Sequence, residues 1–181
     1  TVLYGATGGQ LFVAGSVGER FCVRNSGAVA VVEGTGAHAC EYMTDGTVVI
    51  LGEVGSNLGA GMTGGEAYIY DPSGRLLSTM NRQLVDAARP DDDSDLHFLI
   101  EQHALLTGSS LAADLLDRWS DVRSGFWRVA PIGEVAGIAR AQIAMDQEPD
   151  LAKVDLPVLA AAREHPEALW AFLIDPATPY T

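Results

Sequence analysis

The chain has 181 residues, with 24 acidic and 11 basic side chains and a formal net charge of −13. This acidic balance argues against electrostatic capture of nucleic acid or of an anionic membrane surface. No uninterrupted apolar run reaches the roughly 18 to 20 residues that a transmembrane helix needs, so we expect no membrane span and a cytoplasmic location. The length suits one hydrophobic core, or a core with an appendage.

The chain starts at Thr1, without an initiator Met and without a basic segment followed by an apolar one. A secretory signal would show that pattern. We therefore expect the sequence to be the middle of a longer protein.

Residues 8–71 contain an internal repeat of 19 residues. Glycine recurs at this interval, at Gly8, Gly27, Gly46 and Gly65. Each repeat holds a short β-branched or aromatic run, at residues 11–13, 30–32, 49–51 and 68–70. These runs are too short for helices and are bounded by glycine, which predicts strands.

The repeat predicts a mainly β fold in which equivalent strands stack in parallel. Because one coil alone cannot bury its apolar column, the economical arrangement is a parallel β-helix with 19 residues per coil. Glycine at the corners allows the tight bends between flat faces. A strict 19-residue step aligns Phe12 with Val31, Ile50 and Ile69. A second, weaker strand per coil is predicted at residues 21–24, 40–43 and 59–62.

Beyond the coils, the composition predicts a turn at residues 71–74 and a last strand at residues 75–80, which would finish the stack. An acidic break at residues 90–95 then precedes helical sequence. We therefore divide the chain into coils at residues 1–80 and a helical extension at residues 81–181, packed on or beyond the coils.

The helical part opens with an amphipathic segment at residues 95–107. Its apolar face consists of Leu96, Leu99, Ile100, His103 and Leu106. Gly108 is a typical helix stop, and Ser109 or Ser110 is expected to cap a second helix. The apolar stripe of that helix consists of Leu111, Leu115, Leu116 and Trp119. The short connection predicts an αα-hairpin laid against the β-helix.

The last third of the chain is less regular. An extended stretch is predicted at residues 126–131, followed by an alanine-rich helix at residues 133–145. A more punctuated stretch follows at residues 156–174 and is broken at Pro166. We expect residues 175–181 to form an extended tail.

Residues 59–64 match the G-x-G-x-x-G pattern of dinucleotide-binding loops. That chemistry needs a helix after the glycines, with its N-terminus pointing at the pyrophosphate. Here residues 65–70 predict a strand. We therefore interpret Gly59, Gly61 and Gly64 as corners of a coil.

The ionisable side chains do not form a recognisable site. Four aspartates lack the glycine and terminal Glu of a calcium loop and predict a solvated loop that caps a helix: Asp91, Asp92, Asp93 and Asp95. His38 and Glu41 lie beside Cys40, but in a strand their spacing would point them to opposite faces. The coil carboxylates fall in different columns, unlike the paired acids of a glycosidase. They are Glu19, Glu33, Glu41, Asp45, Glu53 and Glu66.

Two further groups are predicted to be structural. Asn25, Thr44 and Thr63 share a column, and such stacked polar side chains bond to one another and to turn backbone. Cys22 and Cys40 lie in adjacent rather than identical columns. We expect buried free thiols, with a disulfide as the alternative.

Three stretches resemble the C-terminal GXGXG domain of the large (alpha) subunit of glutamate synthase. They are GERFCVRNSG at residues 18–27, VVEG and CEYMT within residues 31–44, and GAGMTGG at residues 59–65. Residues 99–103 and 107–109, with Trp119, continue the similarity. It covers residues 2–131, and beyond Pro131 the sequence departs from the basic run usual in that family.

The resemblance implies a right-handed parallel β-helix that is a non-catalytic scaffold. The enzyme of that family converts L-glutamine, 2-oxoglutarate and reductant into two molecules of L-glutamate. The scaffold would hold the glutaminase and synthase domains of the same protein in register for ammonia transfer. In that family the FMN site, the 3Fe-4S cluster and the catalytic cysteine lie in other domains, so no catalytic, cofactor-binding or metal-binding residue is assigned here.

The resemblance leaves several points open. The chain is either a segment of a glutamate synthase large chain, or a free-standing β-helix scaffold or subunit module of a related amidotransferase or oxidoreductase complex. A flavoprotein small subunit is a further candidate partner. The electron donor is either reduced pyridine nucleotide or ferredoxin.

Overall fold

The computed structural model describes residues 1–133. The helix predicted from Gly133 onward, the stretch at residues 156–174 and the tail at residues 175–181 lie outside the described residues, apart from Gly133 itself. Within residues 1–133, no helix has the length and apolar character needed to span a bilayer.

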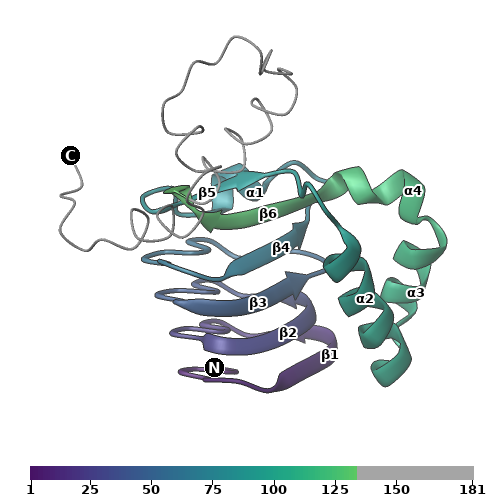
Figure 1. The fold of residues 1–181 in the computed structure, drawn as a ribbon, viewed down its shortest axis with the longest axis horizontal. Coiled ribbons are helices and arrows are strands. Elements are labelled where there is room, and N and C mark those ends of the chain that lie inside the picture. The colour runs from purple at the N-terminus through teal and green to yellow at the C-terminus, as the bar shows by residue number, and fades with distance from the viewer. Residues whose placement is uncertain (134–181) are drawn as a thin grey trace, which may run out of the picture. The chain divides into compact units, whose positions relative to one another are not determined.

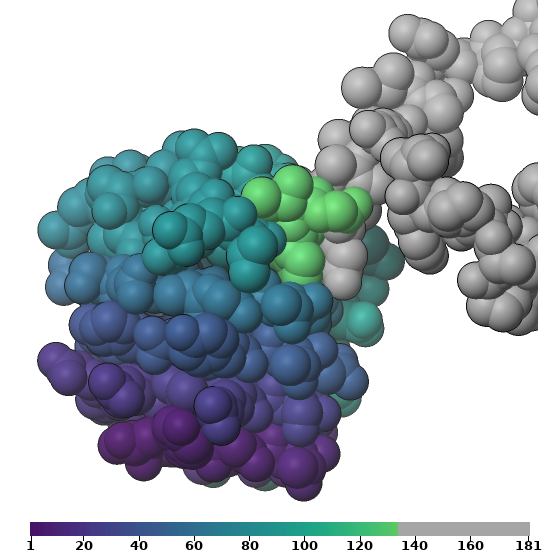
Figure 2. Space-filling model, turned by 90° about the vertical axis from the view of Figure 1, so that its left-hand side faces the viewer, coloured from purple at the N-terminus to yellow at the C-terminus, as the bar shows by residue number. Residues whose placement is uncertain are grey.

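The first half of the chain forms stacked coils, each of which contributes one long strand (Figure 1). These strands are β1 (Gln10–Val17), β2 (Ser26–Thr35), β3 (Asp45–Ile50) and β4 (Glu66–Tyr70). Each pairs in parallel with the next, in the order β1-β2-β3-β4. Figure 2 shows the coils as successive layers, from purple at the N-terminal end through blue to teal. The predicted parallel β-helix is therefore confirmed.

The strand register differs by one residue from the strict 19-residue step. Phe12 pairs with Val31 as predicted, but Val31 pairs with Val49 rather than Ile50. The cause is an irregularity in β2 between Ser26 and Val29, which removes one residue from the step. Since side chains alternate between the faces of a strand, this slip decides which residues point inward.

Two hydrophobic clusters lie on opposite faces of the sheet. The inner cluster fills the coils and includes Ala30, Val32, Val48, Ile50, Ala67 and Ile69. The outer cluster includes Val31, Val49 and Tyr68, and the helices cover it. The sheet is therefore buried on both faces, which explains why its strands are apolar at consecutive positions.

The prediction of weaker strands at residues 21–24, 40–43 and 59–62 is wrong, because turns form at residues 21–24, 40–42 and 59–61 and none of these segments is a strand. Positive φ angles fall on every second residue, at Arg20, Cys22 and Arg24, at His38, Cys40 and Tyr42, and at Asn57, Gly59 and Gly61. Hydrogen bonds still join the coils here. The N–H groups of Cys22, Cys40 and Gly59 donate to Val2, Phe21 and Ala39 in the coil before, at 3.0, 2.8 and 2.9 Å. We call this side of the coils the turn wall.

The elements that close the last coil differ in part from the prediction. Instead of the predicted strand at residues 75–80, α1 (Leu76–Thr79) forms. Two strands then extend the sheet: β5 (Val85–Ala88) and β6 (Phe126–Pro131). β6 lies antiparallel between β4 and β5, which confirms the extended stretch predicted there. β5 was not predicted.

The αα-hairpin is confirmed and packs on the outer face of the sheet (Figure 1). It consists of α2 (Ser94–Thr107) and α3 (Ser110–Asp117), and is followed by α4 (Trp119–Val122) and the 3₁₀ turn η1 (Arg123–Gly125). α2 ends at Gly108, as predicted. Its buried residues are Leu96, Leu99, Ile100 and His103, whereas Leu106, predicted for the same face, is exposed.

Candidate functional site

The glycines of residues 59–64 lie in the turn wall and are used in packing. Gly59 and Gly61 have φ angles of +70° and +68°, a conformation that favours glycine. A Cβ on Gly61 would lie 2.4 Å from the Tyr42 ring, and one on Gly59 would lie 3.1 Å from Val85. The chain leaves the motif as strand β4, as predicted. The motif therefore supports the packing of neighbouring coils.

The predicted polar column is structural at Asn25. This side chain is fully buried, accepts from the Ala28 N–H and donates to the Ala28 carbonyl, both at 2.9 Å. Thr44 and Thr63 are exposed and join the stack through their backbone N–H groups. The bonding of Asn25 to turn backbone is confirmed, but no side-chain ladder links the three residues.

His38 and Glu41 lie together, against the prediction that they point to opposite faces. The distance from His38 Nδ1 to Glu41 Oε1 is 3.3 Å, and Asn57 Nδ2 lies 3.1 Å from the same nitrogen. The prediction failed because it assumed a strand, whereas this segment has alternating positive φ angles. The neighbouring Cys40 is fully buried, and burial raises its pKa to about 12. A thiol so strongly protonated is a poor nucleophile, so Cys40 supplies no ready nucleophile to this group.

The acidic loop before α2 is organised by local contacts. Asp92 accepts a 2.9 Å hydrogen bond from the Ser94 N–H, which lowers the pKa of its carboxyl. Asp93 pairs with Arg123 at 2.9 Å. These contacts agree with the predicted loop at the start of a helix.

The coil carboxylates are dispersed among different partners. Glu33 contacts Ser109, Glu41 contacts His38, Glu53 contacts Arg75 and Glu66 contacts Arg128. Two acids working on one bond would have to face a shared space. The contacts of these four residues do not bring their carboxylates together.

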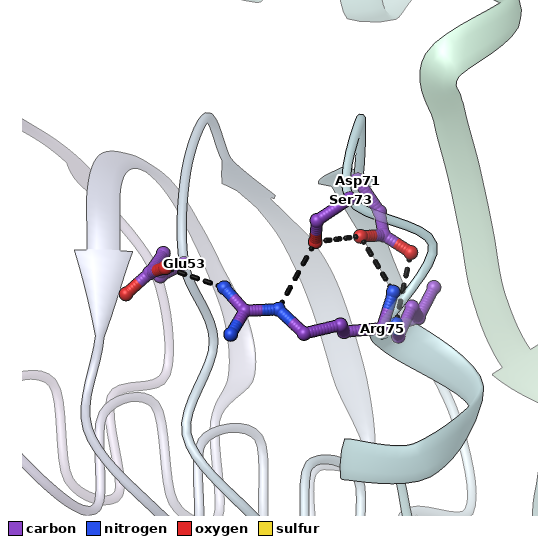
Figure 3. A network of polar contacts seen from close by, with 5 residues as sticks. Glu53, Asp71, Ser73 and Arg75 are labelled. Atoms are coloured by element: carbon purple, nitrogen blue, oxygen red, sulfur yellow. Dashed lines mark hydrogen bonds and ion pairs between the residues drawn. The ribbon is translucent and has the colours of Figure 1, made fainter.

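One pocket that the sequence analysis missed lies where β3 and β4 end. It has a volume of about 370 Å³, and its lining includes Glu53, Ile69, Asp71, Ser73, Arg75 and Leu111. The only sequence signal for it was the turn composition of residues 71–74. Figure 3 shows the polar network at its edge.

The charged groups of this pocket are bonded to one another. Arg75 reaches Glu53 at 2.5 Å and the Ser73 hydroxyl at 3.2 Å. Partial burial opposes ionisation of Asp71, but its carboxylate accepts bonds from the N–H groups of Leu76 and Arg75 and from Ser73, so its pKa is lowered. The bond from Leu76 lies at the first residue of α1. The network thus stabilises the corner, and we assign it no ligand.

The stack of coils, with glycines inside its turn wall, defines a parallel β-helix domain rather than a nucleotide-binding fold. The GXGXG motif family model matches residues 1–132, which include all the coils and the hairpin. The chain therefore belongs to the GXGXG motif family.

The chain is also similar to ferredoxin-dependent glutamate synthases. It is 53% identical over 137 residues to ferredoxin-dependent glutamate synthase 1, chloroplastic/mitochondrial, of Arabidopsis thaliana. The enzymes of Spinacia oleracea and Synechocystis sp. are 54% and 47% identical over the same length. Each match covers 74% of this chain but only 8% or 9% of the relative. The chain thus corresponds to one domain of these much longer proteins.

Proposed function

We propose that this chain is the non-catalytic β-helix segment of a glutamate synthase. It would hold the glutaminase and synthase domains of one polypeptide in register for ammonia transfer. The observation that carries the proposal is the family match over residues 1–132, which includes the whole stack of coils. A stack joined by hydrogen bonds from coil to coil is stiff, which suits a spacer between active sites.

The whole enzyme would make two L-glutamates from L-glutamine and 2-oxoglutarate. The relatives are named ferredoxin-dependent, which favours ferredoxin over reduced pyridine nucleotide as the reductant. A flavoprotein small subunit stays a prediction, which copurification with the full-length polypeptide would test. A cytoplasmic location also stays a prediction, and two plant relatives are named chloroplastic.

We expect FMN and the 3Fe-4S cluster to bind in domains outside this chain. Iron–sulfur clusters are held by several cysteine thiolates, and Cys22 and Cys40 are the only cysteines of the sequence. Both are fully buried, and burial raises the pKa of each thiol. Within residues 1–133, no three His, Cys, Asp or Glu side chains form a group that could hold a metal ion.

The proposal is tested by loosening the stack in the full-length enzyme. Ile50 is fully buried in the inner cluster, and Ile50→Ala would destabilise the domain by about 2 to 5 kcal/mol. We expect more glutamine to be hydrolysed per glutamate formed, because a distorted spacer lets ammonia escape. The measurement is the ratio of the two rates at a temperature where circular dichroism shows the variant folded.

Ser56→Ala is the matched control, because Ser56 lies in the same coil as Ile50 but is exposed. It should leave the ratio unchanged. If Ile50→Ala, or a deletion of one whole coil, retained full coupling, the proposed role would be wrong.

A further inference from the structure

Helix α2 is apolar on two sides. Its inner side packs into the outer cluster through Leu96, Leu99 and Ile100. Its outer side carries Phe98, which is 54% exposed, and Leu105, which is 77% exposed, whereas the exposed Leu106 lies two turns after Leu99, at the end of the inner side. A helix that is apolar all round is normally buried on all sides.

Phe98 and Leu105 form one stripe. They are seven residues apart, which is two turns, so they lie on the same line along the helix. Leu106 does not belong to this line, because it lies two turns after Leu99 on the inner side. No other helix or strand within residues 1–133 carries three of the exposed large apolar side chains.

The edge of this stripe is acidic. Glu101 and Gln102 flank it between its two main residues, and Asp95 lies one turn before Phe98. Asp95 and Glu101 are exposed, and α2 contains no Lys or Arg. A surface that fits the stripe is therefore apolar at its centre and carries Lys or Arg at its edge.

We propose that the outer stripe of α2, made of Phe98 and Leu105, docks against another domain of the same polypeptide, on an apolar patch edged by basic side chains. This inference rests on the proposed function, since it takes the chain to be one segment of a long enzyme. The relatives support that setting, because the matched residues make up only 8% or 9% of their length.

The small area of the stripe favours a domain of the same polypeptide over a separate protein as the docking partner. A stable complex between free proteins buries about 1,200 to 2,000 Å² in total, far more than the side chains of this stripe can supply. Domain contacts within one chain are smaller, at about 600 to 1,500 Å². Tethering also raises the effective concentration to about millimolar, so a small stripe is sufficient.

The test uses the full-length polypeptide and a thiol probe. Leu105→Cys is compared with Leu77→Cys, because Leu77 is an exposed apolar residue on α1. Both variants are treated with a maleimide, and labelling is located by mass spectrometry of the peptide, which separates it from native cysteines. Docking that is closed most of the time should make labelling at position 105 at least about tenfold slower than at position 77.

Dilution of the protein distinguishes docking within one polypeptide from docking by a second copy. Protection within one polypeptide persists when the protein is diluted a hundredfold, whereas protection by a second copy is lost. Equal labelling rates at the two positions, or protection lost on dilution, would overturn the inference. The labelling rate does not depend on catalysis, so a labelling result that contradicts docking would not contradict the proposed spacer role. In the same way, full coupling in Ile50→Ala would contradict the spacer role but not the docking.

Discussion

Single glycines in the stack differ in how closely they approach the coil before them. Gly36 and Gly18 are equivalent positions of consecutive coils, since the Gly36 N–H approaches the Gly18 carbonyl at 3.4 Å. A Cβ on Gly36 would lie 2.8 Å from the Glu19 nitrogen and 3.0 Å from its Cα, whereas a Cβ on Gly18 would meet nothing within 4 Å. The same residue type is thus required by packing at one position and not at the other.

We predict that Gly36→Ala destabilises this chain and that Gly18→Ala does not. The clash at Gly36 involves backbone atoms that cannot rotate away, so the expected loss is about 1 to 3 kcal/mol. At Gly18, the stiffer unfolded chain should leave stability unchanged or raise it by about 0.4 to 1 kcal/mol. Urea unfolding of the two variants checks this. Equal losses would mean that the substitutions act through backbone conformation rather than contact between coils.

The hairpin is attached to the sheet by a small polar cluster as well as by apolar packing. Glu33, on strand β2, accepts a short hydrogen bond from the Ser109 hydroxyl, and its Oε1 lies 3.4 Å from His103 Nε2. Ser109 also caps α3 by accepting from the Ala112 N–H at 3.0 Å. His103 is fully buried, with no hydrogen-bond partner for Nδ1. One serine therefore ties the start of α3 to the sheet.

We predict that Ser109→Ala lowers the free energy of unfolding by about 1 to 2 kcal/mol, because a helix cap is lost. It also leaves the partly buried Glu33 carboxylate without its hydroxyl donor. Ser110→Ala is the control, since that neighbouring serine is exposed and should change stability by less than about 0.5 kcal/mol. Chemical denaturation measures both. An equal effect of the two substitutions would show that Ser109 has no special role.

At the scale of the molecule, the sequence predicted the repeating part of the fold and missed what breaks the repeat. The glycine period is local and regular, so it predicted the parallel stack and the strands around Val31. It could not predict the irregularity near Ser26, which depends on how two coils fit and shifts Val49 into the place expected for Ile50. β5 has only four residues, and its partner β6 begins at Phe126, so no local pattern marked it.

Among the features of the candidate site too, those with a local sequence signal were predicted and those that depend on the folded chain were missed. The glycine motif was interpreted correctly, because the strand after it is visible in the sequence. The contact between His38 and Glu41 was missed, because alternating positive φ angles at residues that are not glycine leave no sequence signal. The pocket beside Arg75 depends on residues from two coils, α1 and α3, which only the folded chain brings together.

The two cysteines lie in the core that all coils share. The equivalent hydrogen bonds of Cys22 and Cys40 to the coil before place them at the same position of consecutive coils, not in adjacent columns as predicted. Both are free thiols and fully buried. Burial raises the pKa of Cys40 to about 12, and that of Cys22 is raised by burial and by its proximity to Cys40.

These thiols should make the stability of the whole stack fall at alkaline pH. An unfolded cysteine loses its proton near pH 8.5, whereas the folded one keeps it up to about pH 12, so the folded state binds more protons between these values. Stability present below pH 8.5 is then lost as the pH rises, by about 1 kcal/mol per pH unit for each thiol. Urea unfolding between pH 7.5 and about 10 measures this slope, and a variant with Cys22→Ala and Cys40→Ala should be much flatter. Staying below pH 10 avoids the buried Tyr68, whose pKa is raised to about 12. If both proteins lost stability equally, the loss would arise elsewhere in the molecule.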